Sequence, residues 1–99
     1  MIPLVISPPI REKLERKHQV RESEIRECFL NHDGQYLEDI RENHLTDPPT
    51  VWFIGRTYQG RELKVIFVHR DGNIHIKSAY DADSDSKRIY TELTQQQGE

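Results

Sequence analysis

The chain has 99 residues, a formal net charge of −3, 34% hydrophobic and 31% charged residues. This length predicts one domain over residues 1–99, with a single modest core at about residues 10–93 and a frayed tail over residues 94–99. The acidic balance argues against nucleic-acid binding driven by bulk charge, whereas a local basic patch remains compatible with it.

Neither a membrane segment nor a secretion signal is predicted. No apolar run approaches the roughly 18 residues of a membrane helix. The opening segment MIPLVIS lacks the charged and apolar regions of a signal peptide. The single cysteine, Cys28, has no partner for an internal disulfide. We therefore expect a cytoplasmic protein with no membrane contact.

A first helix is predicted to begin after Ser7. The proline pair that follows Ser7 suits the first helical positions, where a backbone N–H has no partner anyway. Ile10 and Leu14 then lie on one apolar face. Because no glycine follows this helix, Gln19 is expected to turn the chain.

A second helix is predicted from about Glu22 to Asn31. Glu24 stands where the acid of a capping box is found. Ile25, Cys28 and Phe29 form its apolar stripe. A weak edge strand, Tyr36–Arg41, and an exposed loop, Glu42–Pro49, are expected to follow.

Three consecutive antiparallel strands form the strongest pattern in the chain. They are predicted at Val51–Arg56, Glu62–His69 and Asn73–Ala79, with turns at Gln59-Gly60 and Asp71-Gly72. Asp-Gly between two β-branched and aromatic runs is typical of a type I′ hairpin turn.

Two-residue turns would fix which side chains share a face of this sheet. One face is then predicted to carry Trp52, Ile54, Leu63, Val65, Phe67, Ile74, Ile76 and Tyr80, and to form the core. The other would carry Val51, Phe53, Ile66 and Val68, interrupted by Lys64, His75 and Lys77. This mixed face is either half-solvated, which is the commoner case, or a shallow ligand groove.

A final helix is expected to be capped by Asp81 or Asp83, with Ile89, Tyr90 and Leu93 as its apolar stripe. The segment Asp81–Glu92 also resembles a calcium-binding loop, but Ser86 stands where that loop needs glycine. A capped helix is therefore preferred, and we expect no metal and no cofactor. Together the elements predict an α+β domain: two N-terminal helices, a three- to four-stranded antiparallel meander, and a C-terminal helix packed on the Trp52/Phe67 face.

The order of several short motifs resembles the BrnT family, small toxins of bacterial type II toxin–antitoxin systems with a RelE-like fold. The similarity spans roughly Ile10 to Leu93 and rests on joint order and spacing. The motifs are Lys17-His18, Phe29, Trp52-Phe53-Ile54-Gly55-Arg56, Gly60-Arg61-x-Leu63-x-Val65, Ile74-x-Ile76-x-Ser78-Ala79 and Tyr90. The resemblance implies a ribonuclease that cleaves mRNA and arrests translation. It also implies a cognate DNA-binding antitoxin and a toxin–antitoxin hetero-oligomer, for which the exposed edge at Tyr36–Arg41 would suit strand addition or helix docking.

RNA supplies its own nucleophile, so such an enzyme must remove the 2′-OH proton, protonate the leaving oxygen and stabilise a dianionic phosphorane. Basic side chains can do all three without a metal ion. The catalytic candidates are Arg61, Lys77, His75 and His18, and the RNA-binding candidates are Arg56, Lys64 and Arg88. Arg61 lies beside a turn, so we expect Arg61→Ala to leave folding intact. Solvent exposure without function is the competing interpretation for Arg61.

The chain departs from the family pattern near its end. Family members commonly carry a basic residue after the Ser-Ala pair and an acid early in the last helix, where this chain has Tyr80 and Ser86. The acids Asp81, Asp83 and Asp85 would also repel phosphate. A catalytically inactive protein-binding module of the same fold is therefore the alternative function.

Overall fold

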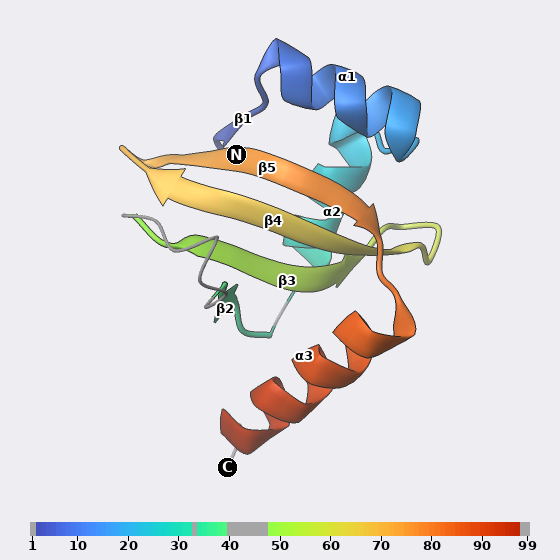
Figure 1. Ribbon diagram of the computed structural model, residues 1–99, viewed down its shortest axis with the longest axis vertical. Helices are drawn as coiled ribbons and strands as arrows, with labels where there is room; N and C mark the ends of the chain where they lie inside the picture. The colour runs from blue at the N-terminus through green and yellow to red at the C-terminus, as the bar shows by residue number, and fades with distance from the viewer. Residues whose placement is uncertain (1, 33, 40–47, 98–99) are drawn as a thin grey trace.

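The computed structural model describes residues 2–32, 34–39 and 48–97, with no side-chain description for residues 96 and 97. In chain order the elements are β1 (Leu4–Val5), α1 (Pro8–Lys17), α2 (Glu22–Asn31), β2 (Leu37–Glu38), β3 (Thr50–Arg56), β4 (Glu62–Arg70), β5 (Asn73–Asp81) and α3 (Ser84–Gln97). They form an α+β domain around one five-stranded sheet of order β1-β5-β4-β3-β2 (Figure 1).

The sheet is mixed, which corrects the prediction of a purely antiparallel meander. Strands β2 to β5 pair antiparallel, whereas β1 pairs parallel to β5. The sequence analysis missed β1, because two residues give no readable alternation. None of the helices in the described part of the chain has the length and apolar character needed to span a bilayer.

The two N-terminal helices begin and end close to their predicted bounds. The Ser7 carbonyl accepts a hydrogen bond from the Arg11 amide at 2.8 Å. Leu14 is buried on the inner side of α1, and Gln19 turns the chain with a φ of 52°. At the start of α2 the Arg21 amide donates to Glu24 Oε1 at 3.0 Å. This is half of a capping box, since the guanidinium of Arg21 cannot accept the return bond.

The β4–β5 hairpin confirms the predicted type I′ turn, because Asp71 and Gly72 have φ values of 54° and 77°. The β3–β4 connection differs from the prediction. Arg56 pairs with Glu62, so residues 57–61 form a longer loop. Thr57 closes this loop, since its carbonyl accepts from the Gly60 amide at 2.9 Å and its hydroxyl from the Arg61 amide at 3.0 Å.

That loop shifts the register of β3 by one residue, and the predicted faces are therefore wrong. Trp52 lies opposite Ile66, while Phe67 lies opposite Val51. Trp52 and Phe67 thus point to opposite faces of the sheet, because a one-residue slip turns every side chain over.

A second irregularity lies in β5. Ile66 pairs with Ser78 and Phe67 with Ile76, so Lys77 is the extra residue of a β-bulge. Beyond the bulge, Tyr80 lies opposite Lys64 rather than on the face of Ile76, where it was predicted.

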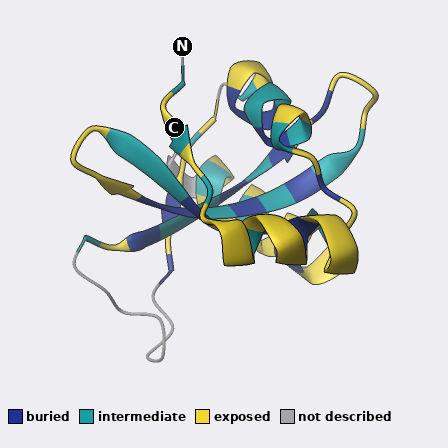
Figure 2. Ribbon diagram, turned by 90° about the horizontal axis from the view of Figure 1, so that it is seen from above, coloured by how far each residue is buried: buried dark blue, intermediate teal, exposed yellow. Residues whose placement is uncertain are grey.

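Helices cover both faces of the sheet (Figures 1 and 2). We call the face under α1 and α2 the inner face and the face crossed by α3 the outer face. The inner face holds the core, formed by Leu14, Val20, Ile25, Cys28, Phe29, Phe53, Leu63, Val65, Phe67, Ile76 and Ala79. Burial among these residues raises the pKa of the Cys28 thiol to about 12.

The C-terminal helix lies on the Trp52 side alone, which corrects its predicted place on a shared Trp52/Phe67 face. The rings of Tyr90 and Trp52 are 5.7 Å apart, and the Tyr90 hydroxyl donates to the Gln35 carbonyl at 2.6 Å. Most of α3 is exposed, including Ile89 and Leu93. The helix also includes residues 94–97, which we expected to fray.

Asp83 caps α3, since its Oδ1 accepts a hydrogen bond from the Ser86 amide at 2.7 Å. This confirms the capped-helix interpretation of the segment Asp81–Glu92. Within the described part of the predicted edge strand, Leu37–Glu38 form β2, which pairs with β3, and Tyr36 and Asp39 lie outside the strand. Residues 40–41 of the predicted strand, and residues 42–47 of the predicted loop, lie outside the described residues.

Candidate functional site

The structure brings two of the predicted catalytic residues, His18 and Arg61, together at one end of the sheet. His18 follows α1, and Arg61 precedes β4. A hydrogen bond of 3.0 Å joins Arg61 Nη2 to the carbonyl of His18. The two residues are far apart in sequence and meet because α1 lies over β5 while β4 pairs with it.

Arg61 is the hub of this region, and it is not the solvated residue that its turn position suggested. Its Nε donates to Asp81 Oδ1 at 2.7 Å, and its Nη2 donates to Asp81 Oδ2 at 3.2 Å. Its Nη1 donates to the Gln19 carbonyl at 2.8 Å and to Glu24 Oε2 at 3.1 Å. The guanidinium therefore joins the α1–α2 turn, α2 and β5. We expected Arg61→Ala to leave folding intact because Arg61 was interpreted as a surface residue beside a turn. The hydrogen bonds of its guanidinium contradict that premise.

His18 is half-buried beside the ring of Tyr80, with the two ring centroids 5.4 Å apart. Burial lowers the pKa of His18, and the charges of Lys17 and Lys13 lower it further, against a smaller opposing effect of Asp81. The neutral imidazole is therefore the dominant form near pH 7. A neutral imidazole beside two cations can accept a proton while an anion is held next to it.

We call this group the His18 site; it consists of Lys13, Lys17, His18, Arg61, Tyr80 and Asp81. The sequence analysis named Lys17 only as part of the Lys17-His18 motif and did not name Lys13, although the i, i+4 spacing of the two lysines before His18 was a usable signal. Tyr80 was predicted to lie on the core face and was otherwise considered only as a departure from the family pattern.

The acidic run beside the site is largely engaged by the protein. Hydrogen bonds from Arg61 hold the pKa of Asp81 below its ordinary value. The Ser86 amide does the same for Asp83 at the start of α3. Asp85 lies 3.9 Å from Arg88 Nη2. Arg61 offsets the charge of Asp81 directly. A lowered pKa keeps these carboxyls ionised, so the repulsion of phosphate expected from the acidic run remains.

His75 and Lys77 do not join the His18 site. His75 lies opposite Val68 and Val5, whereas Asp81, which contacts Arg61, stands six residues farther along β5. At about 3.3 Å per residue this separation is roughly 20 Å. Lys77 lies between them, exposed in the bulge. The four predicted catalytic residues therefore do not form one group.

The predicted RNA-binding residues are also dispersed. Arg56 lies 3.6 Å from Glu62, and Arg88 lies 3.5 Å from Glu92, with both arginine side chains more than half exposed. Lys64 points along the outer face, with its ammonium 4.5 Å from the centroid of the Trp52 ring.

A polar groove of about 500 Å³ opens next to the Arg61 hub, between the start of α2 and the β3–β4 loop. Its lining includes Arg21, Ser23, Glu27 and Tyr58. Since it presents both signs of charge, it does not by itself favour an anionic ligand. Within residues 2–32, 34–39 and 48–97, no group of His, Cys, Asp and Glu side chains is arranged to hold a metal ion.

Comparison with known proteins gives no family assignment: the chain matches no protein-family model, and a search of curated proteins finds no significant match.

Proposed function

We propose that this protein is the toxin of a bacterial type II toxin–antitoxin system, a RelE-like endoribonuclease of the BrnT type that cleaves mRNA and arrests translation. The observation that carries the proposal is the half-buried imidazole of His18, 5.4 Å from the ring of Tyr80 between centroids, with Lys13 and Lys17 near enough to lower its pKa. The frame of two N-terminal helices, meander and C-terminal helix is compatible with this fold family. The ordered motifs from Lys17-His18 to Tyr90 support the same proposal.

The proposed reaction needs no metal ion. His18 accepts the proton of an RNA 2′-OH, and the resulting oxygen attacks the adjacent phosphorus. The bond from phosphorus to the 5′-oxygen breaks, which leaves a 2′,3′-cyclic phosphate. Lys13 and Lys17 stabilise the dianionic phosphorane, and one of their ammonium groups gives a proton to the leaving 5′-oxygen.

Arg61 acts in this proposal as a positioning residue. A phosphate would have to displace Asp81 or Glu24 from its guanidinium, and both are bound through charge-assisted hydrogen bonds. Its bonds to the carbonyls of His18 and Gln19 instead fix the turn that carries the imidazole.

The proposal includes a cognate antitoxin bound in a hetero-oligomer. The support is the resemblance and the position of β2 as the last strand in the order of the sheet. Reading the neighbouring gene is the cheapest test, since an isolated gene without a small DNA-binding protein beside it would count strongly against a toxin.

Induced expression without a partner tests the activity directly. Wild type should arrest growth, and the purified protein should cleave single-stranded RNA. His18→Ala should lower cleavage by about 10²–10⁴-fold, because it removes the general base. His69→Ala is the matched control, since His69 is an exposed histidine at the far end of β4. His75→Ala and Lys77→Ala separate the two ends of β5. If these two variants lose activity while His18→Ala stays active, the active centre lies at the bulge of β5 and not at the His18 site.

The alternative is a catalytically inactive RelE-like module that recognises only protein. The engagement of Arg61 by Asp81 and Glu24 favours it, because the best phosphate-binding side chain is already occupied. A wild-type protein that arrests no growth and cleaves no RNA, yet binds the product of the neighbouring gene, would establish this alternative.

A further inference from the structure

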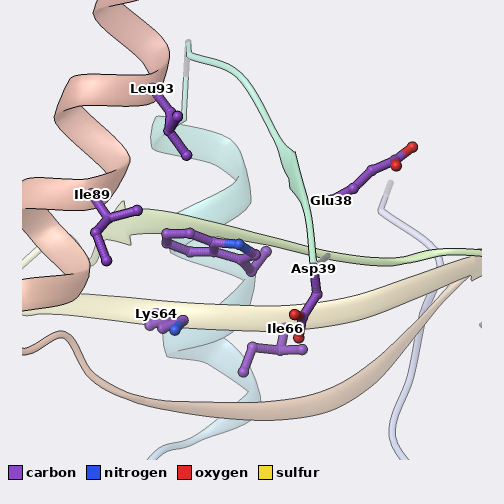
Figure 3. A pocket seen from close by; sticks show the side chains of 7 residues that line it. Glu38, Asp39, Lys64, Ile66, Ile89 and Leu93 are labelled. Carbon is purple, nitrogen blue, oxygen red and sulfur yellow. The ribbon is translucent and has the colours of Figure 1, made fainter. Parts of the chain in front are cut away.

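A cavity of about 330 Å³ lies between α3 and the outer face of the sheet (Figure 3). Ile89 and Leu93 of α3 form one wall, and Trp52 and Ile66 of the sheet form another. The volume is at the lower end of the range of small-molecule sites. Ile89 and Leu93 are 39% and 40% exposed, so the α3 wall is open to an incoming apolar group.

Charges mark the two ends of this cavity. At one end the Lys64 ammonium lies 4.5 Å from the Trp52 ring centroid and 3.4 Å from Ser86 Oγ. The aromatic ring and the hydroxyl hold the cation in place. At the other end is the carboxylate of Asp39, which follows β2, whereas Glu38 lies opposite Val51 and its side chain points away from the cavity (Figure 3). The cavity therefore offers apolar walls, a fixed cation and one carboxylate.

The cavity is connected to the His18 site through a row of three rings and one cation, Lys64. Lys64 lies opposite Tyr80 in the β4–β5 pairing, and cross-strand neighbours have Cβ atoms about 5 Å apart. Tyr80 in turn contacts His18, at 5.4 Å between ring centroids. Imidazole, phenol, ammonium and indole thus follow one another from the end of α1 to α3. Alternating aromatic and basic groups are typical of surfaces that bind single-stranded nucleic acid.

We propose that this cavity takes one unpaired base of single-stranded RNA, with Lys64 beside the neighbouring phosphate; that the ligand is RNA rests on the proposed function. A base is flat and has apolar faces, which suit Trp52, Ile89 and Leu93. The exocyclic amino group of adenine, cytosine or guanine can donate to a carboxylate oxygen of Asp39. Its phosphate is the anion that Lys64 is placed to meet.

Trp52 is the only tryptophan of the chain, so its fluorescence reports on this cavity alone. The probe is a ten-residue oligodeoxynucleotide, which lacks the 2′-OH and cannot be cleaved. Single-stranded probe should quench Trp52 fluorescence, while a duplex of equal length should not, because its bases are stacked and paired. Binding is followed in parallel by anisotropy of a labelled probe.

Two variants and a control examine the contacts. Lys64→Ala should weaken binding about tenfold and reduce the salt dependence by about one phosphate contact. Ile89→Glu should remove the quenching, since it adds a carboxylate to a wall that is already partly exposed and so should fold normally. Arg70→Ala, a cation removed from the exposed far end of β4, should leave affinity and quenching unchanged.

The outcomes separate this inference from the proposed ribonuclease activity. RNA cleavage with unchanged Trp52 fluorescence, and a Lys64→Ala variant that binds like wild type, would overturn the base site and leave the activity standing. If single-stranded probe quenches Trp52 fluorescence and the protein cleaves no RNA, the base site is supported and the proposed ribonuclease activity is contradicted. If no probe binds and the product of the neighbouring gene quenches Trp52 instead, α3 is a protein-docking face and the base site is wrong.

Discussion

The environment of His18 makes a prediction about pH. The pKa of this imidazole is lowered from its ordinary value of 6.5 by burial and by two lysines. Because catalysis needs the neutral form, cleavage should persist below pH 6.5 and fall only as the pH drops through the lowered pKa. The measurement is the pH dependence of the cleavage rate, together with an NMR titration of the His18 ring that does not depend on activity.

Lys17→Met should raise the midpoint of both curves, since it removes a positive charge next to the imidazole. Lys87→Met is the control. Lys87 lies on α3, pairs with Glu62 of β4 at 3.0 Å and does not contribute to the pKa of His18. A midpoint above 6.5 in wild type, or one that Lys17→Met lowers, would contradict this account of His18.

The connection between the helices and the sheet depends on Arg61, and this predicts a loss of stability. Its side chain is 26% exposed and bonds to two carboxylates and two carbonyls. Arg61→Ala removes all of these hydrogen bonds, although the Arg21 amide still donates to Glu24, and should lower the free energy of unfolding by about 2 kcal/mol. Arg61→Lys should recover only part of the loss, because an ammonium cannot reproduce the planar fork.

Urea unfolding measures this effect, with Arg16→Ala as the matched control. Arg16 is 81% exposed in its side chain and pairs only with Glu12, so its loss should change stability by less than about 0.5 kcal/mol. Arg61→Lys should also change the NMR titration of His18 if Arg61 positions that residue. Equal stability of the two alanine variants would show that the Arg61 hub does not hold in solution.

The close packing of α2 on β3 predicts that Gly55 tolerates no side chain. A Cβ at this position would lie 2.6 Å from the Cβ of Cys28 and 3.0 Å from its carbonyl oxygen. Backbone cannot move aside as a flexible side chain can, so Gly55→Ala should cost about 2–3 kcal/mol. Thermal unfolding tests this expectation, with Thr91→Ala on the exposed side of α3 as the control. A Gly55→Ala variant as stable as wild type would mean that α2 does not lie this close to β3.

Local signals in the sequence predicted the elements well, whereas the pairing of β3 depended on a loop that they did not determine. Asp71-Gly72 fixed the β4–β5 turn because both residues adopt positive φ. Gln59-Gly60 resembled a similar turn, but hydrogen bonds of Thr57 hold a longer loop. This one-residue shift placed Trp52 on the outer face and Phe53 in the core. Alternation alone could not decide between them, since both residues are large, apolar and adjacent.

At the level of the whole molecule, the candidate site was only partly predictable. His18 and Arg61 were chosen for their chemistry, and their contact depends on the crossing of α1 over β5, which no local pattern encodes. His75 and Lys77 were grouped with them as basic side chains on the predicted mixed face of the sheet. The bulge at Lys77 and the length of β5 separate them from the His18 site.

The parallel strand β1 also has a consequence for how the chain assembles. Leu4 lies opposite Ile74, a separation of 74 − 4 = 70 residues, and the Ile74 amide donates to the Pro3 carbonyl at 2.9 Å. Closing so long a loop costs far more conformational entropy than closing the Asp71-Gly72 hairpin, so β1 should dock after β4 and β5 have paired. During synthesis β1 leaves the ribosome before the other strands of this domain, and it must wait for β5 to emerge. Throughout that interval the outer edge of β5 is open to pairing with other nascent chains.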